Sequence, residues 1–167
     1  MLNKGLYDKG IIVAETFDYD IIDKAYRPYE NLSLVVSLKS TGEIEKAVVG
    51  SVVESLKADK SFEEDYSKLV EVFKAPSLQM VSFTITEKGY GVPPFDLDKG
   101  LDAAFAMGKV TALLYERFKA NKAPLTLQSM DNCSHNGEKV KDAVLKYASR
   151  WVEDGLVEKE FLDYVSS

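Results

Sequence analysis

The stretch TLQSMDNCSHNGEKV, residues 126–140, holds a strand, a turn and the start of a helix in one short segment. An apolar run predicts a strand over 125–129, and small and polar residues end this strand from Asp131 to Gly137. Apolar residues at helical spacing then continue to Trp151, which predicts a helix over 136–151. A polar turn between a strand and a helix is either a plain connector or the edge of a binding site.

The segments before this stretch also alternate between strands and helices. Turn residues between two β-rich runs predict a hairpin, and the pattern SFEE at 61–64 predicts a capped helix start. The predicted elements are a strand at 10–15, hairpin strands at 33–38 and 44–53, a helix at 61–74, a strand at 79–86, a helix at 100–121, a strand at 125–129, and helices at 136–151 and 156–165. This order predicts an α/β fold with a partly parallel sheet, crossover helices and a β-hairpin insertion. We expect its buried strands at 11–14, 81–85 and 125–127.

Composition limits the classes of protein that this chain can belong to. Its 167 residues fit one domain with a hydrophobic core. The net charge of −6 comes without a Lys/Arg stripe, so we expect no nucleic-acid partner. A single cysteine excludes an internal disulfide, and the sequence has no apolar run of signal or membrane length. These features predict a cytoplasmic protein that does not bind membranes.

Three polar clusters follow predicted strands: Glu15 with Thr16, the segment TEKGY at 86–90, and Asp131 with Asn132. Ligands of open α/β sheets bind beyond the carboxyl ends of the strands, so parallel neighbours would bring these clusters to one edge. Glu15 either binds the ribose of a dinucleotide or is solvated. The TEKGY segment either cradles a cofactor, with Gly89 permitting close backbone approach, or is an ordinary loop.

The segment after residue 130 allows two interpretations as well. Asp131 and Asn132 either orient a substrate hydroxyl or make local turn hydrogen bonds. Asn136 is predicted to cap the following helix. His135 has no Cys/His set at metal-ligand spacing around it, so we expect no metal site. Cys133 next to His135 in sequence is weak support for a nucleophile, since neighbours in sequence need not share an active site.

Glycine patterns that bind phosphate groups do not occur in this sequence. No G-x-G-x-x-G or P-loop motif follows a predicted strand. The only comparable pattern, Gly89-Tyr90-Gly91, is followed by prolines where a helix would have to begin.

Two motifs nevertheless resemble the mannitol dehydrogenase family, which includes polyol dehydrogenases and fructuronate and tagaturonate reductases. They are VSFTITEKGY at 81–90 and SMDNCSHNG at 129–137, and residues 4–52 resemble the second strand and hairpin of the same family's nucleotide domain. The resemblance implies a Rossmann-like fold. It implies that residues 1–167 form a single truncated dinucleotide-binding domain that lacks the first strand and the Gly-rich turn.

The resemblance also implies a chemistry and a set of site residues. Family members transfer a hydride between a nicotinamide and a secondary alcohol of mannitol, mannonate, altronate or a similar polyol or sugar acid, and a lysine outside the matched region takes the proton without a metal. Asn132 matches the catalytic asparagine that polarises the reacting oxygen. The implied cofactor-binding residues are Glu15, Thr86, Glu87, Lys88 and Gly89. We expect this chain alone to be inactive and to bind NAD or NADP weakly or not at all.

Two further expectations concern the chain as an isolated molecule. The alternative function is that of an α/β module without catalytic activity, which binds a ligand or partner and shares only the fold of the dehydrogenases. An exposed sheet edge is expected to favour self-association.

Overall fold

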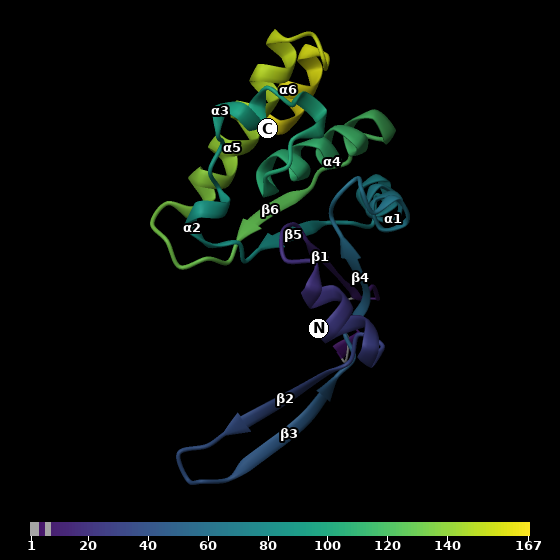
Figure 1. Ribbon diagram of the computed structural model, residues 1–167, viewed down its shortest axis with the longest axis vertical. Coiled ribbons are helices and arrows are strands. Elements are labelled where there is room, and N and C mark those ends of the chain that lie inside the picture. Colours follow the sequence, from purple (N-terminus) through teal and green to yellow (C-terminus); the bar gives the residue numbers. More distant parts are fainter. Residues whose placement is uncertain (1–3, 6–7) are drawn as a thin grey trace. The chain divides into compact units, whose positions relative to one another are not determined.

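The computed structural model describes residues 4–5 and 8–167, and the chain divides into two compact units, Met1–Ala58 and Asp59–Ser167 (Figure 1). The first unit contains β1 (Ile11–Glu15), the π-helix η2 (Ile22–Tyr26), the 3₁₀-helix η3 (Arg27–Tyr29), β2 (Ser33–Leu38), β3 (Ile44–Val49) and β4 (Val52–Lys57). The second contains α1 (Glu63–Lys74), β5 (Met80–Phe83), α2 (Thr86–Gly89), α3 (Pro94–Leu97), the 3₁₀-helix η4 (Gly100–Asp102), α4 (Ala106–Ala120), β6 (Thr126–Ser129), α5 (Asn136–Glu153) and α6 (Lys159–Ser166). The predicted mixed α/β class with parallel strand pairs is confirmed.

The first unit is built from a parallel pair and a hairpin. β1 pairs with β4 in parallel, and β2 pairs with β3 in antiparallel register. The prediction of one strand over 44–53 is wrong, because Gly50 and Ser51 separate β3 from β4 and the Ser51 carbonyl accepts a hydrogen bond from the Ile11 N–H at 2.8 Å. β4, which follows the hairpin, therefore turns away from β3 and pairs with β1.

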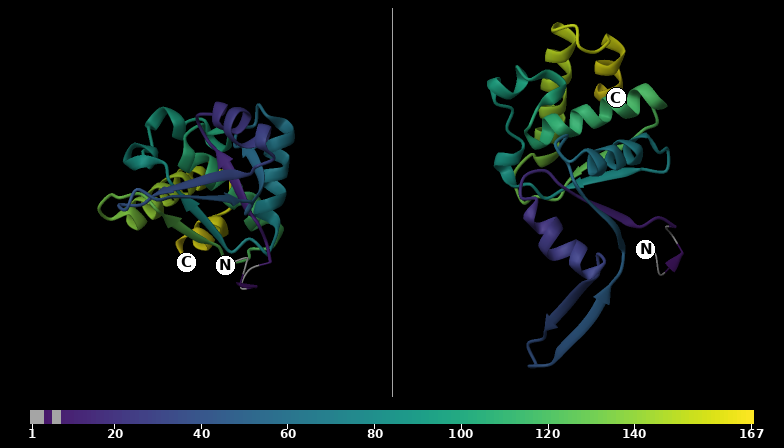
Figure 2. Two further views of the ribbon diagram at one scale, coloured as in Figure 1. Left: turned by 90° about the horizontal axis from the view of Figure 1, so that it is seen from below. Right: turned by 45° about the vertical axis from the view of Figure 1, so that its right-hand side comes forward.

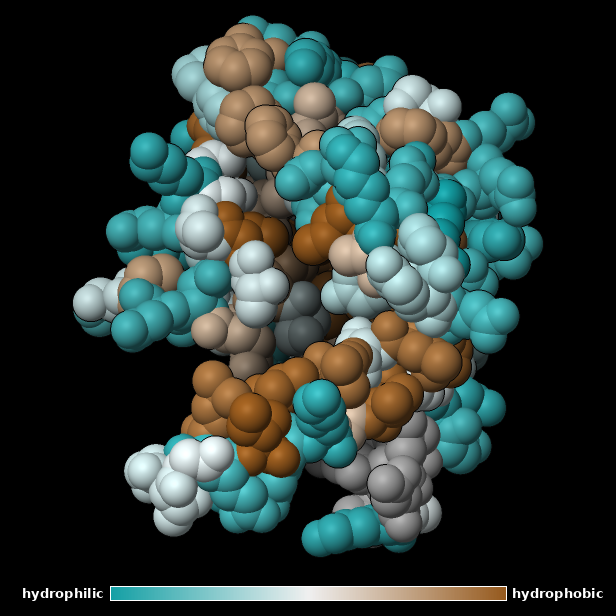
Figure 3. Space-filling view, turned by 60° about the horizontal axis from the view of Figure 1, so that its bottom comes forward, coloured by the Kyte–Doolittle hydropathy of each residue, from teal (hydrophilic) through white to brown (hydrophobic). Residues whose placement is uncertain are grey.

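Much of the apolar surface of the first unit is exposed. β1 was expected to be buried, but its Ile11 side chain is 54% exposed, because β4 is the only strand beside it among the described residues. Both strands of the hairpin also carry large exposed hydrophobic side chains. Figure 3 shows hydrophobic residues gathered on the molecular surface.

The second unit is organised around the parallel pair β5–β6 (Figures 1 and 2). The crossover between the two strands contains α4, which packs against α1, α5 and α6, while α5 also packs against β6. The helix faces predicted from apolar spacing are buried: Met107, Val110, Thr111, Leu114 and Phe118 on α4, and Val140, Ala143, Val144, Tyr147 and Trp151 on α5. Phe118 and Phe161 lie edge to face, with ring centroids 5.6 Å apart, and join α6 to this core.

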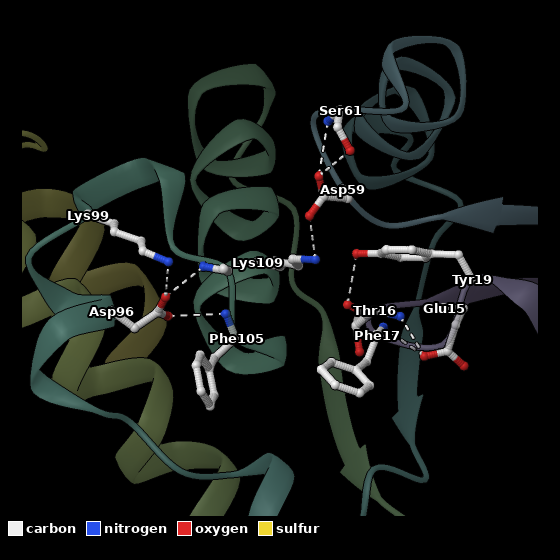
Figure 4. Close-up of polar contacts among 11 residues, drawn as sticks. Glu15, Thr16, Phe17, Tyr19, Asp59, Ser61, Asp96, Lys99, Phe105 and Lys109 are labelled. Carbon is white, nitrogen blue, oxygen red and sulfur yellow. Dashed lines mark hydrogen bonds and ion pairs between the residues drawn. The ribbon is translucent and has the colours of Figure 1, made fainter.

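The start of α4 is set by a buried carboxylate rather than by local helix propensity. Asp96 accepts hydrogen bonds from the N–H groups of Ala104 at 2.8 Å and Phe105 at 3.1 Å, immediately before the helix begins (Figure 4). The Tyr147 hydroxyl donates to the same carboxylate at 2.6 Å. Burial raises the pKa of Asp96, but these three hydrogen bonds outweigh it and hold the pKa below its ordinary value. The helix therefore begins at Ala106 and not at residue 100 as predicted.

The predicted capping box at 61–64 does not form. α1 begins at Glu63, and the Ser61 hydroxyl donates instead to Asp59 at 2.7 Å. Asp59 also accepts from the Lys109 ammonium at 2.8 Å (Figure 4). The Ser61 hydroxyl is therefore bound to Asp59 and not to a backbone N–H of the helix.

Candidate functional site

Two polar segments meet at one end of the β5–β6 pair. The strands run in parallel with Met80 opposite Thr126 and Phe83 opposite Ser129, so both carboxyl ends lie at the same edge. Residues 84–90 and 130–137 leave the sheet there, which confirms that these two predicted clusters share an edge. The third cluster, at Glu15, belongs to the other unit.

Asp131 joins the two segments through its carboxylate. Oδ2 accepts a hydrogen bond from the N–H of Ile85 at 3.0 Å, and Oδ1 accepts one from the N–H of Thr86 at 3.1 Å. The Tyr90 hydroxyl also donates to Oδ2. Thr86 has a φ of 61°, which is a left-handed conformation that β-branched residues rarely adopt. Asp131 thus holds a strained turn in place, and strain of this kind is concentrated at functional sites.

Tyr90 and Ser129 complete this arrangement, which we name the Asp131 clamp: Ile85, Thr86, Tyr90, Ser129 and Asp131. The buried Tyr90 hydroxyl lies 2.6 Å from the Ser129 hydroxyl as well as donating to Asp131. Burial and the hydrogen bond to Asp131 raise the pKa of Tyr90 to about 12. The same hydrogen bond, followed by those from the backbone, holds the pKa of Asp131 below its ordinary value against burial. The roles of Tyr90 and Ser129 were not predicted from the sequence, although both residues lie inside the two motifs.

Asn132 follows the clamp and is exposed. Its side-chain amide makes no hydrogen bond to any residue that the structure describes, so both its donor and acceptor groups face solvent. Local turn bonding, the alternative interpretation of Asp131 and Asn132, applies to neither side chain among the described residues, because the Asp131 carboxylate bonds residues 85, 86 and 90. The side chain of Asn132 is held by its backbone alone, next to Asp131, whose carboxylate is fixed in position by three donors.

Asn136 does not cap α5 as predicted. The cap position is occupied by His135, which has a φ of 55° and makes no side-chain capping bond. This left-handed residue places Asn136 in the first helical turn, and its amide donates to the Asp131 carbonyl at 2.9 Å. Asn136 therefore closes the loop between β6 and α5. The exposed His135 has its Nδ1 3.1 Å from a carboxylate oxygen of Glu138.

The residues at 86–89 form the one-turn helix α2. Thr86, Glu87 and Lys88 are exposed, and Glu87 forms an ion pair with Lys139 on α5 that lowers the pKa of the Glu87 carboxyl. Gly89 has a packing reason to be glycine, because a Cβ there would lie 2.9 Å from the Cβ of Ile85. The predicted role of Gly89 in cofactor approach stays a prediction.

Glu15 ends β1 in the first unit, where its carboxylate binds its own turn. Oε1 accepts from the N–H groups of Thr16 at 2.8 Å and Phe17 at 3.0 Å (Figure 4). The Glu15 carbonyl accepts from Ala58 at 2.7 Å, which fixes the end of β1 beside the end of β4. A rigid acid at a strand end is compatible with the ribose-binding role, which stays a prediction.

Within the described ranges 4–5 and 8–167, no group of three His, Cys, Asp or Glu residues could hold a metal ion. None of the helices in the same ranges is both long and apolar enough to cross a membrane.

The clamp predicts how stability depends on pH. The folded-state pKa of Asp131 is lowered, so its carboxylate stabilises the fold above the unfolded pKa, and this contribution is lost as the pH falls through the folded pKa. We expect Asp131→Asn to be less stable than the natural chain at neutral pH, with the difference shrinking below about pH 4. Urea unfolding at a series of pH values measures this difference. A stability difference that is constant with pH would contradict the assignment of a charged clamp.

Comparison with known proteins agrees with the motifs. No protein-family model matches the chain. D-mannonate oxidoreductase of Thermotoga maritima is 47% identical over 176 residues, which covers 99% of this chain and 32% of that protein. Mannitol 2-dehydrogenase of Cereibacter sphaeroides is 31% identical over 159 residues, with 81% of this chain and 32% of that protein covered.

The fold gives the same relationship. The structure of Pseudomonas fluorescens mannitol 2-dehydrogenase, in a ternary complex with NAD and D-mannitol, matches with a TM-score of 0.74 and 26% identity, over 95% of this chain and 33% of that one. The chain spans about a third of the length of the curated relatives it matches. These similarities, together with the two motifs at the edge of β5 and β6, show that the chain belongs to the mannitol dehydrogenase family and has a Rossmann-like fold.

Proposed function

We propose that this chain is part of the NAD(P)-binding domain of a metal-independent dehydrogenase that acts on a polyol or sugar acid such as mannitol, mannonate or altronate. The observation that carries the proposal is the Asp131 clamp, which joins the TEKG turn to the exposed Asn132 at the carboxyl ends of two parallel strands. Ligands of open α/β sheets bind at this position. The relatives named above are oxidoreductases of mannonate and mannitol, which supports the substrate class.

Asn132 is the proposed catalytic residue. Negative charge builds on the substrate oxygen when a hydride reaches its carbon, and an amide N–H directed at that oxygen stabilises the charge. The Asn132 amide suits this role because it is exposed and bonds no described residue. Asp131 holds the Asn132 backbone in place, and Asn136 closes the loop behind it.

The cofactor would lie along the turn at 86–89. Thr86, Glu87, Lys88 and Gly89 are the proposed contacts in the second unit, and Glu15 is the proposed ribose contact in the first. The exposed polar groups of the turn fit a polar cofactor. When bound, the nicotinamide supplies the site that accepts or donates the hydride. An activity screen of the full-length protein against mannitol, mannonate, altronate and arabinitol, with NAD and with NADP, tests the proposal; activity with none of the eight pairs would overturn it.

Cofactor affinity of the isolated chain is a separate prediction. The sequence contains no Gly-rich turn, which in dinucleotide folds holds the pyrophosphate with backbone N–H groups at a helix N-terminus. Hydrogen bonds to charged groups contribute about 1.5–3 kcal/mol each, so losing several leaves weak binding. We expect the 167-residue chain to bind NAD at millimolar affinity or weaker and to show no dehydrogenase activity.

Calorimetry and amide chemical shifts measure this binding. Weak shifts confined to residues 84–90 and 130–137 would support the proposed position of the cofactor. A micromolar dissociation constant, or shifts that leave both segments unchanged at saturating NAD, would show that the cofactor site is misplaced.

A further inference from the structure

The β2–β3 hairpin carries several large, exposed apolar side chains. Leu34 is 62% exposed, Leu38 is 77% exposed and Val48 is 68% exposed, although all three belong to the paired strands of the hairpin. Within the described residues, the sheet contains these two strands only. A two-stranded hairpin is marginally stable in water by itself, and a third strand or a covering layer is needed to stabilise it.

The register shows which backbone groups are available for another strand. Lys39 donates to the Glu43 carbonyl at the closed end, so the hydrogen-bonded pairs continue at every second residue, with Ser37 opposite Glu45 and Val35 opposite Ala47. The residues between them turn their N–H and C=O groups outward. On β2 these residues are Leu34, Val36 and Leu38, and on β3 they are Ile44, Lys46 and Val48.

The two outer edges differ in charge. β3 carries Glu45 and Lys46, and Lys46 is one of its outward-facing residues. β2, with the sequence SLVVSL, has no charged residue and no proline. Natural edge strands are normally protected from pairing by charges, prolines or bulges. The edge of β2 has none of these, so it is the edge that can accept another strand.

A second copy of the same strand fits this edge. Two antiparallel β2 strands related by a twofold axis at Val36 place Val36 opposite Val36 and Leu34 opposite Leu38. All three outward-facing residues of each strand then form hydrogen-bonded pairs. The side chains of these outward-facing β2 residues lie on the same face of the sheet as those of their partners in the hairpin. These partners are Ile44, Lys46 and Val48. The same arrangement through β3 would set Lys46 against Lys46, and like charges directly opposite destabilise a sheet.

We propose that the outer edge of β2 is a homodimer interface, in which two hairpins form a continuous four-stranded antiparallel sheet centred on Val36. This inference does not depend on the proposed enzymatic function. The proposed dimer gives the expected self-association a defined strand, β2, and a defined register. The outer edge of β3 stays free.

Proline substitution distinguishes the two edges. Val36→Pro removes an outward-facing N–H of β2, and Val48→Pro removes an outward-facing N–H of β3, so neither change removes a hydrogen bond of the hairpin itself. In light scattering over a concentration series, we expect the natural chain and Val48→Pro to shift from the 18.6 kDa monomer to twice that mass. We expect Val36→Pro to stay monomeric. A natural chain that is monomeric throughout, or two variants that behave alike, would overturn the proposal.

Disulfide cross-linking tests the register without introducing a proline. In a Cys133→Ser background, Val36→Cys places two thiols at the twofold axis, where hydrogen-bonded partners have Cα atoms about 5.5 Å apart, a separation that a disulfide spans. We expect this variant to give a covalent dimer under mild oxidation. Leu34→Cys is the matched control, because its partner is Leu38 of the other copy and not itself. Equal cross-linking of both variants would exclude the register centred on Val36.

Discussion

An Arg117→Met variant is expected to lose about 3–5 kcal/mol of unfolding free energy, because hydrogen bonds to a charged donor contribute about 1.5–3 kcal/mol each and this change removes several of them. Single domains have only about 5–15 kcal/mol in total, so this one change would leave the chain close to unfolding at room temperature. Methionine keeps much of the volume of the side chain, and the effect should therefore come from lost hydrogen bonds rather than from a cavity.

The expected size follows from the surroundings of Arg117, which is completely buried on α4. Its guanidinium donates to five backbone carbonyls and to no carboxylate among the described residues. The acceptors are Phe73 at 2.7 Å, Ala75 at 2.8 Å, Leu78 at 2.9 Å, Ala123 at 2.8 Å and Pro124 at 3.1 Å. Removing the donor leaves these carbonyls without partners, and each unsatisfied buried group costs about 1–3 kcal/mol before the structure relaxes.

Arg117 also explains how β5 and β6 are aligned. Leu78 precedes β5 by two residues and Pro124 precedes β6 by two, so one side chain holds the segments that enter both strands. The Asp131 clamp joins the same strands where they end. Two polar side chains thus fix the β5–β6 pair at its two ends, and the register of the site depends on both.

Urea unfolding followed by circular dichroism measures the predicted loss. Lys119→Met removes an exposed cation from the same helix and should change stability little. Arg117→Lys should be intermediate, because lysine keeps the charge but has three donors in place of five. If Arg117→Met unfolds at the same urea concentration as Lys119→Met, the five carbonyl contacts do not stabilise the fold.

The sequence predicted the helices of the second unit well, because their buried faces recur at helical spacing. The apolar faces of α4 and α5 could be named residue by residue. Helix starts were less predictable, because tertiary contacts set them. Asp96 caps α4 from eight and nine residues upstream, and Asp59 accepts hydrogen bonds from both Ser61 and Lys109. The pairing of Asp59 with Lys109 joins residues 50 positions apart, so a local sequence window does not contain it.

The site was predictable to a similar degree. Strand ends and motifs located the segments at 86–90 and 131–136, and the parallel pairing of β5 with β6 brings them together. The hydrogen bonds inside the clamp were not predictable, since Asp131 and Thr86 are far apart in sequence and Tyr90 gives no periodic signal. β4 was missed for a related reason: β3 and β4 are adjacent apolar runs, and only the pairing of β4 with β1 shows that a new strand begins.

In the full-length protein, Asn132→Ala is expected to lower turnover by about 10²–10³, or about 3–4 kcal/mol, the usual cost of removing one donor to a developing oxyanion. Cofactor affinity should change little, because the proposed cofactor contacts lie on the 86–89 turn and in the first unit. Asn132→Asp should be worse, since it would place a negative charge beside the oxygen where negative charge builds. Steady-state kinetics and thermal unfolding of each variant provide the measurements.

Asn136→Ala is the matched control, because it removes an amide of the same loop whose partner is known. It loses the hydrogen bond to the Asp131 carbonyl, which should cost about 1 kcal/mol of stability, whereas turnover should fall much less than in Asn132→Ala. Asn132 makes no hydrogen bond that the structure describes, so its loss should leave the melting temperature nearly unchanged. If Asn132→Ala melts early and turns over normally, Asn132 is a turn residue and not the catalytic amide. The opposite pattern, a loss of turnover with unchanged melting temperature and unchanged cofactor affinity, would support a bound substrate oxygen as the partner of the Asn132 amide.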